Sequence, residues 1–230
     1  MHPDFQVLSS YKERLFGQLG LLGRALASPR RLELLDLLCQ AERSVDELAR
    51  ESGLSASNVS QHLRVLKECH LVEFTRDGLH ARYHIADAAV AAFWTQYREL
   101  AFSRLAEVRE LLRAQHALGE GTEAIAAEDL KQRMAAGEVC LIDVRSEAEY
   151  RAGHLPGAIS MPLAQLADRL AELPRDRELV AYCRGPFCIL ADEAVRTLGE
   201  RGVPARRLAA GPREWQDRGF PLDGAPPAAR

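Results

Sequence analysis

Two cysteines near the carboxyl end, Cys183 and Cys188, are the side chains of this sequence best suited to covalent chemistry. They flank a short segment, 184–187, that follows the apolar run RELVAY and precedes a helical pattern from Ile189. A cysteine between a strand end and a helix start faces backbone N–H groups and the positive end of the helix dipole, and both stabilise an anion. We therefore predict a lowered pKa for the Cys183 thiol and a loop that holds a sulfur anion on it.

The other residues of this segment have supporting roles. The backbone that would form the anion cradle belongs to Gly185, Pro186 and Phe187. Arg184 either attracts an anionic sulfur donor or is an ordinary solvated surface arginine. Cys188 either attacks a persulfide on Cys183, which gives a disulfide or a sulfur-bridged link, or fills space in the first helical turn. Sulfane sulfur bound covalently to Cys183 is the ligand that this chemistry needs, and we expect no cofactor.

Helical and apolar stretches alternate throughout the carboxy-terminal half, which predicts an α/β domain with a mainly parallel sheet. Ligand sites of such sheets lie at the carboxyl ends of the strands, where Cys183 is found. The expected strands are 139–144, 179–182 and 206–209, and the expected helices are 127–136, a segment after Ser146, 163–173 and 189–198. The polar residues expected to fix loops around the site are Asp143, Arg145, Glu149 and His154. Cys140, inside the first of these strands, is expected in the core.

A helix-turn-helix pattern occupies the middle of the amino-terminal half. Ser44 and Glu47 fit a capping box, so a helix is predicted from Val45. Gly53 supplies the turn, and Ser55 caps the following helix, whose inward face is apolar.

The next segment, LVEFTRDGLHARYHI, predicts two strands around Asp77-Gly78, and a helix-turn-helix followed by a hairpin is a mainly α winged helix. If the second helix docks in the major groove, its polar residues would face the DNA. These residues are Ser55, Ser57, Asn58, Ser60, Gln61, His62 and Arg64. Three residues of the wing would lie along the DNA backbone or in the minor groove: Arg76, His80 and Arg82. The alternative is a polar, solvated face on a protein-interaction module.

Two longer helical patterns flank the winged helix. The first, 5–28, carries Gly17, Gly20 and Gly23 near one face, which indicates either close packing of another helix or a frayed segment. The second predicts one continuous helix over 87–118, about 45 Å long. Because such a helix extends beyond its small domain, we predict that it pairs with its counterpart in a homodimer. The expected organisation is a domain at 1–118, a polar linker at 119–124 and a second domain at 125–230.

Composition and charge limit the partners and the cellular compartment that can be expected for this protein. The formal net charge is −3, so any affinity for nucleic acid must come from a local patch. The five cysteines are an odd number without framework spacing and include no CxxC zinc pair, which favours a reducing compartment. The amino terminus lacks a leader pattern, and no run of about 18 apolar residues occurs, so we expect a cytoplasmic location and no membrane partner.

Two families are recognisable in these motifs. LASPRRLELLDLL, SVDELARESGLSASNVSQHLRVL and RDGLHARYHI resemble the ArsR family of small dimeric repressors over roughly 15–115. VCLIDVRSEAEYRAGHLPGAISMPL, LVAYCRGPFC and LAAGPREWQDRGFPL look like a rhodanese domain over 124–223. The first resemblance implies a homodimer that reads a pseudo-palindromic, double-stranded operator. The second implies that Cys183 takes sulfane sulfur from a small donor such as thiosulfate, polysulfide or a persulfide.

The sequence departs from both families at functional positions. Many rhodanese loops have a glycine three residues and a basic residue five residues after the cysteine, where this chain has Pro186 and Cys188, so efficient turnover is in doubt. The usual ArsR metal ligands are absent, and the long helix offers only His116, so no metal site is expected. Cys39 and Cys69 are either small apolar fillers or thiol sensors.

Two functional hypotheses follow from these observations. The first is a transcriptional repressor that responds to reactive sulfur through a Cys183 persulfide or a Cys183–Cys188 sulfur link. The second is a sulfurtransferase whose DNA-binding domain controls its own expression. A third possibility is that the rhodanese domain is an inert docking module.

Overall fold

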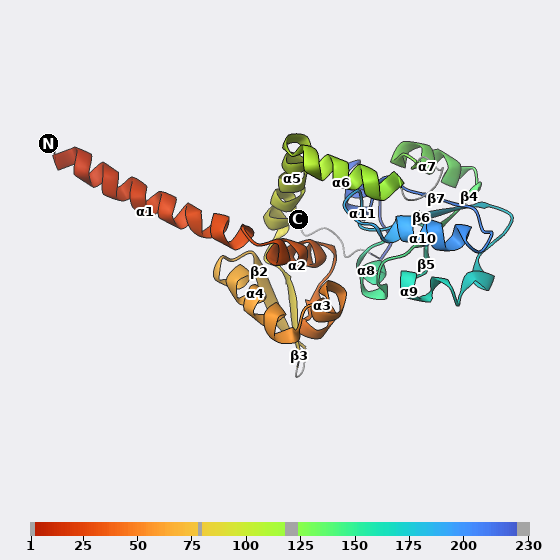
Figure 1. The fold of residues 1–230 in the computed structure, drawn as a ribbon, viewed down its shortest axis with the longest axis horizontal. Helices are drawn as coiled ribbons and strands as arrows, with labels where there is room; N and C mark the ends of the chain where they lie inside the picture. The colour runs from red at the N-terminus through yellow and green to blue at the C-terminus, as the bar shows by residue number, and fades with distance from the viewer. Residues whose placement is uncertain (1–2, 78–79, 118–123, 225–230) are drawn as a thin grey trace. The chain divides into compact units, whose positions relative to one another are not determined.

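The structure is a computed structural model that describes residues 3–77, 80–117 and 124–224 (Figure 1). The chain divides into two compact units, Met1–Glu99 and Leu100–Arg230. The expected linker at 119–124 lies, except for its last residue, outside the described residues.

The first unit is built of helices and a small antiparallel sheet. Its elements are α1 (Pro3–Leu26), α2 (Pro29–Gln40), β1 (Arg43–Ser44), α3 (Val45–Ser52), α4 (Ala56–Glu68), β2 (Val72–Asp77), β3 (His80–Ile85) and most of α5 (Ala88–Arg104). The sheet order is β1-β3-β2, and β2 pairs antiparallel with β3 from Val72 opposite Ile85 onward. The predicted winged helix is therefore confirmed, and β1 is a short strand that the sequence pattern did not indicate.

Capping side chains set the helix boundaries of the helix-turn-helix. The Ser44 hydroxyl accepts the Glu47 N–H at 3.2 Å, and the Glu47 carboxylate accepts the Ser44 N–H at 2.7 Å. Gly53 ends α3 at a φ of +68°, in the left-handed region that favours glycine. The Ser55 hydroxyl accepts the Asn58 N–H at 3.3 Å at the start of α4. Each of these caps typically stabilises its helix by about 1 kcal/mol.

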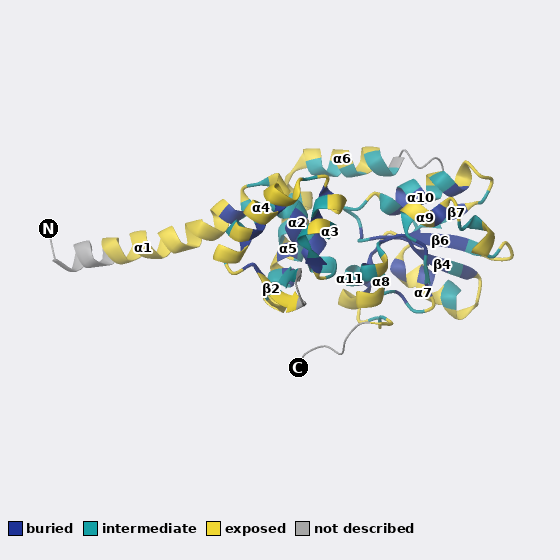
Figure 2. Cartoon of the chain, turned by 90° about the horizontal axis from the view of Figure 1, so that it is seen from below, coloured by how far each residue is buried: buried dark blue, intermediate teal, exposed yellow. Residues whose placement is uncertain are grey.

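The core of the first unit is an aliphatic cluster between α2, α3 and α4. Leu48 of α3 and Leu63 and Leu66 of α4 are fully buried, at the inward positions that the helical periodicity predicts. Trp94 of α5 closes the cluster, and its indole N–H donates to the Asp36 carboxylate at 2.7 Å. Burial of this face fixes the outward direction of the opposite face of α4 (Figure 2).

Helix α1 is regular over its whole length, so the alternative of a frayed segment is wrong. A Cβ atom at Gly17, Gly20 or Gly23 would meet no atom within 4 Å, so no other described helix of the first unit packs against this face. Most of α1 is exposed (Figure 2), and its exposed apolar side chains include Tyr11 and Phe16.

The expected continuous helix over 87–118 is broken. Helix α5 ends at Arg104, and α6 (Ala106–Ala117) begins after Leu105. The Arg109 guanidinium donates to the carbonyls of Phe102 and Ser103 at 2.9 and 3.0 Å. These hydrogen bonds satisfy carbonyl groups that the last turn of α5 leaves without helical partners, so the chain can bend there.

The second unit is α/β, as predicted, with a parallel sheet of order β5-β4-β6-β7. Its elements are α6, α7 (Ala127–Ala135), β4 (Val139–Asp143), α8 (Glu147–Ala152), β5 (Ile159–Ser160), α9 (Leu163–Leu166), the 3₁₀ helix η1 (Leu170–Glu172), β6 (Glu178–Tyr182), α10 (Leu190–Gly199), β7 (Ala205–Arg207) and α11 (Pro212–Asp217). The expected helix at 163–173 is thus two short pieces, and β5 and α11 are additions.

Apolar clusters cover both faces of this sheet. Val180 and Tyr182 of β6 join a cluster that contains Trp215 of α11. Leu179 and Ala181, which point the other way, join a cluster with α9 and α10. This period of two is why β6 reads as a continuous apolar run. The described part of the chain contains no helix long and apolar enough to cross a membrane.

Candidate sulfur site and DNA-binding face

The sulfur loop, which we define as residues 183–189, joins the end of β6 to the start of α10, as the sequence predicts. Cys183 is buried, with 3 % of its surface exposed, and its Sγ lies 3.4 Å from the Cys188 carbonyl oxygen. The Cys188 N–H donates to the Gly185 carbonyl at 3.1 Å, which closes the loop into a turn. Both cysteines therefore lie in one small loop, with Cys183 inside and Cys188 half-buried.

The expectation of a lowered pKa at Cys183 is wrong. Burial raises the pKa of this thiol well above its usual value, and the hydrogen bond and negative charge of Cys188 raise it further. The backbone N–H groups of Ala191 and Gly185 act in the predicted direction and lower the pKa, but they are outweighed. The sequence reveals the amides but not how completely the surrounding side chains exclude water.

The pKa of Cys188, by contrast, is lowered to about 7. The largest cause is the hydrogen bond that the Cys183 side chain gives to Cys188, and burial opposes it. The positive charge of Arg184 and the backbone N–H groups of Arg184 and Leu190 lower the pKa further. The amide-lined loop thus stabilises one negative charge on the pair of thiols.

Arg184 is not a freely solvated side chain. Its guanidinium pairs with the buried carboxylate of Glu149, at 2.7 Å from Nε to Oε1 and 2.8 Å from Nη2 to Oε2. The same carboxylate accepts the Ser146 N–H and hydroxyl at the start of α8. The interpretation of Arg184 as an ordinary solvated surface arginine is therefore wrong, because the arginine ties the sulfur loop to α8 and much of its charge is neutralised there. Attraction of an anionic donor by Arg184 stays a prediction.

Close backbone contact holds the other side of the loop. Gly185 has a φ of +104°, and a Cβ atom there would lie 2.8 Å from Glu214 Cδ. A Cβ atom at Gly211 would lie 2.5 Å from the Gly185 nitrogen and 2.6 Å from the Arg184 carbonyl carbon. Gly211 also donates its N–H to the Glu214 carboxylate at 2.9 Å. No role was predicted for Gly211 and Glu214 from the sequence, although both lie in the rhodanese-like segment LAAGPREWQDRGFPL.

A buried polar network supports the neighbouring strand ends. The Arg145 guanidinium donates to both oxygens of Asp143, at 2.9 Å from Nε and 2.7 Å from Nη2, and to the Gly153 carbonyl at 2.7 Å. The Tyr182 hydroxyl donates to Asp143 at 2.8 Å, and burial raises the pKa of Tyr182. Nδ1 of His154 lies 2.8 Å from the Tyr150 carbonyl. These contacts fix loops, as predicted for these polar residues.

His116 of α6 contacts the sulfur loop, a role that the sequence analysis did not foresee. Its Nε2 lies 3.2 Å from the Pro186 carbonyl oxygen, and its Nδ1 lies 3.0 Å from an oxygen of Asp192 in the first turn of α10. A histidine on a helical pattern gives no signal of such distant partners.

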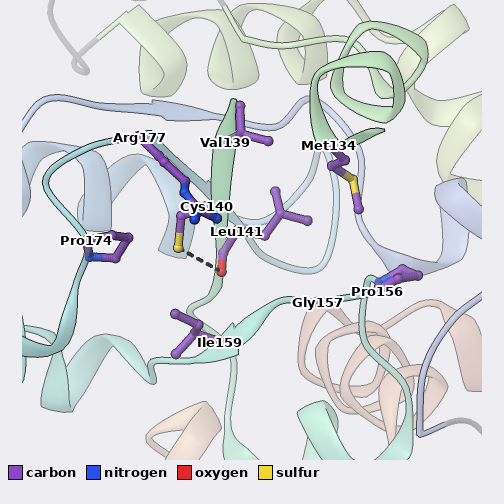
Figure 3. A pocket seen from close by; sticks show the side chains of 9 residues that line it. All are labelled: Met134, Val139, Cys140, Leu141, Pro156, Gly157, Ile159, Pro174 and Arg177. Carbon is purple, nitrogen blue, oxygen red and sulfur yellow. Dashed lines mark hydrogen bonds between the residues drawn. The ribbon is translucent and has the colours of Figure 1, made fainter. Parts of the chain in front are cut away.

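Cys140 lies away from this loop, at a surface cavity of about 370 Å³ (Figure 3). Pro174 and Arg177 line the same cavity. Cys140 is half-buried rather than fully in the core, and burial raises its pKa. In the first unit, Cys39 and Cys69 are also half-buried and pack against the apolar cluster, which fits the interpretation as fillers. Among the residues that the structure describes, no three His, Cys, Asp or Glu side chains are grouped to hold a metal ion.

The outward face of α4 forms the candidate DNA-binding face. Val59 and Leu63 point into the core, whereas the predicted contact residues are exposed or, for His62, half-buried. The exposed ones are Ser55, Ser57, Asn58, Ser60, Gln61 and Arg64. Donor and acceptor groups on the second helix of a helix-turn-helix suit the base edges of the major groove.

The three wing residues that were predicted to contact DNA differ in their surroundings in the structure. Arg76 is exposed on β2. Arg82 pairs with Glu42 at 2.8 Å and with Glu47 at 3.5 Å, so its charge serves the base of the wing instead of extending toward DNA. His80 begins β3, but its side chain lies outside the described part of the structure.

Comparison with known proteins defines the class of this chain. Residues 28–73 match the family described as bacterial regulatory protein, arsR family, and residues 126–218 match the rhodanese-like domain. The human thiosulfate:glutathione sulfurtransferase is 33 % identical over 113 residues, which cover 43 % of this chain and 96 % of that protein. The fold and these matches define a winged-helix regulator joined to a rhodanese-like domain.

A relative that is similar over nearly the full length of this chain shows the family to which the chain belongs. The HTH-type transcriptional regulator Rv0324 of Mycobacterium tuberculosis is 45 % identical over 95 % of this chain and 96 % of its own length. The homodimeric winged helix-turn-helix domain of Mb0332 from Mycobacterium bovis is 38 % identical, with a TM-score of 0.40 over 42 % of this chain and 89 % of that one. The chain belongs to the ArsR family of transcriptional regulators and carries a carboxy-terminal rhodanese-like domain.

Proposed function

We propose that this regulator is a cytoplasmic, DNA-binding repressor that responds to reactive sulfur species through Cys183 and Cys188. The observation that carries the proposal is the pair of thiols in one amide-lined loop, with the pKa of Cys188 lowered to about 7. At neutral pH this pair presents a substantial fraction of thiolate to a donor, as a sulfur-sensing cysteine requires. The same chain carries a DNA-binding unit, so a sulfur signal and its output lie in one molecule.

The chemistry begins at Cys188, which is less buried than Cys183. Its thiolate attacks the terminal sulfur of a polysulfide, an S–S bond forms to Cys188, and the donor leaves as a dianion one sulfur shorter. The Cys183 thiol then gives its proton to the new persulfide and attacks as a thiolate. Attack on Cys188 Sγ forms a disulfide and releases HS⁻, so the two thiols are oxidised and the sulfane sulfur is reduced. Attack on the terminal sulfur instead leaves a persulfide on Cys183 and a thiolate on Cys188.

Intact-mass and peptide mass spectrometry after exposure to polysulfide tests this chemistry. We expect the wild-type peptide that contains both cysteines to gain one sulfur atom or to lose two hydrogen atoms. Cys183→Ser is expected to stop at the Cys188 persulfide, and the double variant Cys183→Ser/Cys188→Ser is expected to stay unmodified at this peptide. Cys140→Ser is the matched control, because it removes another half-buried thiol of the same unit. A wild-type peptide that never changes mass contradicts the proposal.

Recognition of DNA is proposed to use the exposed face of α4, with Asn58, Gln61 and Arg64 as candidates for base or phosphate contacts. The operator partner is double-stranded DNA with two half-sites roughly 34 Å apart, as symmetric helix-turn-helix dimers require. Because that spacing tolerates little change, a small movement of the reading helices is enough to weaken binding.

The homodimer itself is proposed from the unpartnered apolar surface of α1 and of the end of α5. Phe16 is 65 % exposed on α1, and Leu100 is 57 % exposed on α5. The open glycine positions of α1 also leave room for the close approach of a second helix. Exposed apolar surface on this scale indicates an interaction site, and a second copy of the chain fits the expected two-fold operator.

A second candidate function is sulfur transfer with turnover. It is favoured by the 33 % identity to a protein named as a thiosulfate:glutathione sulfurtransferase. Against efficient turnover with thiosulfate, a dianion, stand the pairing of Arg184 with Glu149 and the Glu214 carboxylate beside Gly185. Steady-state assays with thiosulfate and glutathione separate the candidates, since rapid, sustained turnover that survives Cys188→Ser supports the enzyme. A modification that stops after one sulfur per chain supports the sensor.

A further inference from the structure

The side chain of His116, in the last turn of α6, connects α6 to the sulfur loop and to α10. One ring nitrogen of His116 faces the Pro186 carbonyl at 3.2 Å, and the other faces the Asp192 carboxylate at 3.0 Å. Pro186 lies between the two cysteines in the sequence, and Asp192 lies in the first turn of the helix that follows them. His116 therefore contacts the middle of the sulfur loop and the helix that follows it.

The two partners of His116 are both hydrogen-bond acceptors. A carbonyl and a carboxylate both accept hydrogen bonds, and a neutral imidazole has only one N–H to give. The imidazolium form donates to both and forms an ion pair with Asp192. Arg207 of β7 approaches the same Asp192 oxygen at 3.1 Å, whereas the other oxygen of this buried carboxylate has no hydrogen-bond partner. Asp192 thus has acceptor capacity left, and it can keep its hold on His116 when the loop moves.

We expect sulfur on the pair to disturb the Pro186 side of this contact. Cys183 is 3 % exposed, and its Sγ already lies 3.4 Å from the Cys188 carbonyl oxygen, so an added sulfur atom is expected to displace its neighbours. A disulfide would bring the two Sγ atoms to about 2.05 Å, far closer than a hydrogen bond allows. Either product is expected to shift the turn between Gly185 and Cys188. The Pro186 carbonyl belongs to that turn and shifts with it.

Helix α6 is held at both ends. Near its start, Arg109 binds the carbonyls of Phe102 and Ser103 at the end of α5, and in its last turn His116 binds the sulfur loop. Helix α5 is anchored in turn in the first unit, where Trp94 donates to Asp36 of α2. A path of contacts from the sulfur loop toward the winged helix thus runs through the hydrogen-bonded His116, α6 and the bend at Leu105.

We propose that His116 is the positioning residue through which the state of the sulfur loop is passed to α6 and on toward the DNA-binding unit. This inference rests on the proposed sulfur-responsive function and assigns its regulatory contact. In the reduced protein His116 holds α6 to the loop, and formation of the persulfide or disulfide removes the Pro186 acceptor, so that His116 is left with Asp192 alone and the end of α6 can shift.

The test uses the full-length protein and His116→Ala, with His116→Gln as a second variant that keeps one side-chain N–H donor group. Arg113→Ala is the matched control, because Arg113 is exposed on the same helix. Two quantities are measured on each protein before and after treatment with polysulfide. They are the mass of the peptide with both cysteines and the affinity for a duplex that the wild type itself selects from a random-sequence pool.

We expect polysulfide to reduce the affinity of the wild type and of Arg113→Ala by roughly tenfold, within the usual range of allosteric coupling. His116→Ala is expected to take up sulfur like the wild type while its affinity changes by less than about twofold, below the roughly fivefold lower end of usual allosteric coupling. His116→Gln is expected to lie between them. Uptake without response is a result that a merely structural role would not give.

The inference is overturned if His116→Ala releases DNA as the wild type does, or if a folded His116→Gln cannot take up sulfur at all. In the first case the signal takes another path, and in the second His116 serves the loop and not the transmission. Both outcomes leave the response of the wild type intact. A wild type that takes up no sulfur, or keeps its affinity after uptake, instead removes the proposed function and this inference with it.

Discussion

Cys183 and Cys188 titrate as a pair, although they differ in burial and in pKa. The inner thiol is desolvated and keeps its proton, and it donates a hydrogen bond that lowers the pKa of the outer thiol to about 7. Arg184 adds positive charge to the same thiolate, but it also serves Glu149. At the scale of single residues, we therefore propose Cys188 as the nucleophile at neutral pH and Cys183 as its hydrogen-bond donor and later partner.

A pH profile of alkylation tests this division of roles. We expect the rate at Cys188, measured with iodoacetamide and peptide mass spectrometry, to rise with pH through a midpoint near 7, because the thiolate fraction rises through the pKa. Cys183→Ala removes the largest cause of the lowered pKa, so its midpoint is expected to move upward. Cys140→Ser serves as the control and is expected to keep the wild-type profile. If the midpoint of Cys188 alkylation does not move in Cys183→Ala, the hydrogen bond from Cys183 is not what lowers the pKa of Cys188.

At the scale of elements, the sulfur loop depends on close contact between two backbone segments. Gly185, in the loop, and Gly211, just before α11, touch where neither tolerates a side chain. Glu214 of α11 accepts the Gly211 N–H, and Arg184 ties the loop to α8 from the opposite side. Two short helices thus shape the loop whose thiols are proposed to react, so its geometry is a property of the folded unit.

Gly211→Ala tests the dependence on backbone contact. The new Cβ atom would lie 2.5 Å from the Gly185 nitrogen, so the loop or α11 must shift, and we expect a loss of roughly 1–3 kcal/mol in unfolding free energy. We also expect slower sulfur uptake, measured by mass spectrometry at a temperature where the variant is folded. Gly199→Ala, at the end of α10, meets no atom within 4 Å and is the control. A Gly211→Ala protein as stable and reactive as this control would rule out the contact.

At the scale of the whole molecule, a regulator of this family has to present two reading helices to one operator. Among the described residues, the apolar side chains on α1 and on the end of α5 are exposed, and they form the surface proposed for assembly. The bend at Leu105 and the hold of His116 on the sulfur loop place the route of the proposed signal on α6. Assembly and response are therefore assigned to different helices.

Phe16→Glu tests the assembly. Phe16 is 65 % exposed on α1, so the substitution leaves the fold of one chain nearly unchanged but would bury a charge in a dimer interface. We expect analytical ultracentrifugation to show a dimer for the wild type and a monomer for Phe16→Glu at micromolar concentration, with a matching loss of affinity for DNA. Arg14→Glu, an exposed substitution on the same helix, is the control for charge. A wild type that sediments as a monomer contradicts the dimer.

Much of this protein follows from its sequence alone, because the relevant signals are local. The capping box at Ser44, the turn at Gly53 and the alternation of β6 each involve neighbours in the chain, and the structure has them as predicted. The position of the two cysteines between a strand and a helix is local in the same sense. Local hydrogen bonds and periodicity therefore determine the element types, the two domain classes and the place of the candidate site.

Only the tertiary structure decides which thiol carries the charge and what the charged residues do. The pKa of a thiol depends on desolvation and on nearby charges, and these come from residues far apart in the sequence. Arg184 meets Glu149 across 35 residues, and His116 meets Asp192 across 76. The break at Leu105 likewise depends on where the Arg109 side chain finds free carbonyls. Periodicity records which side of an element is buried, but it does not record which polar groups meet when the elements pack.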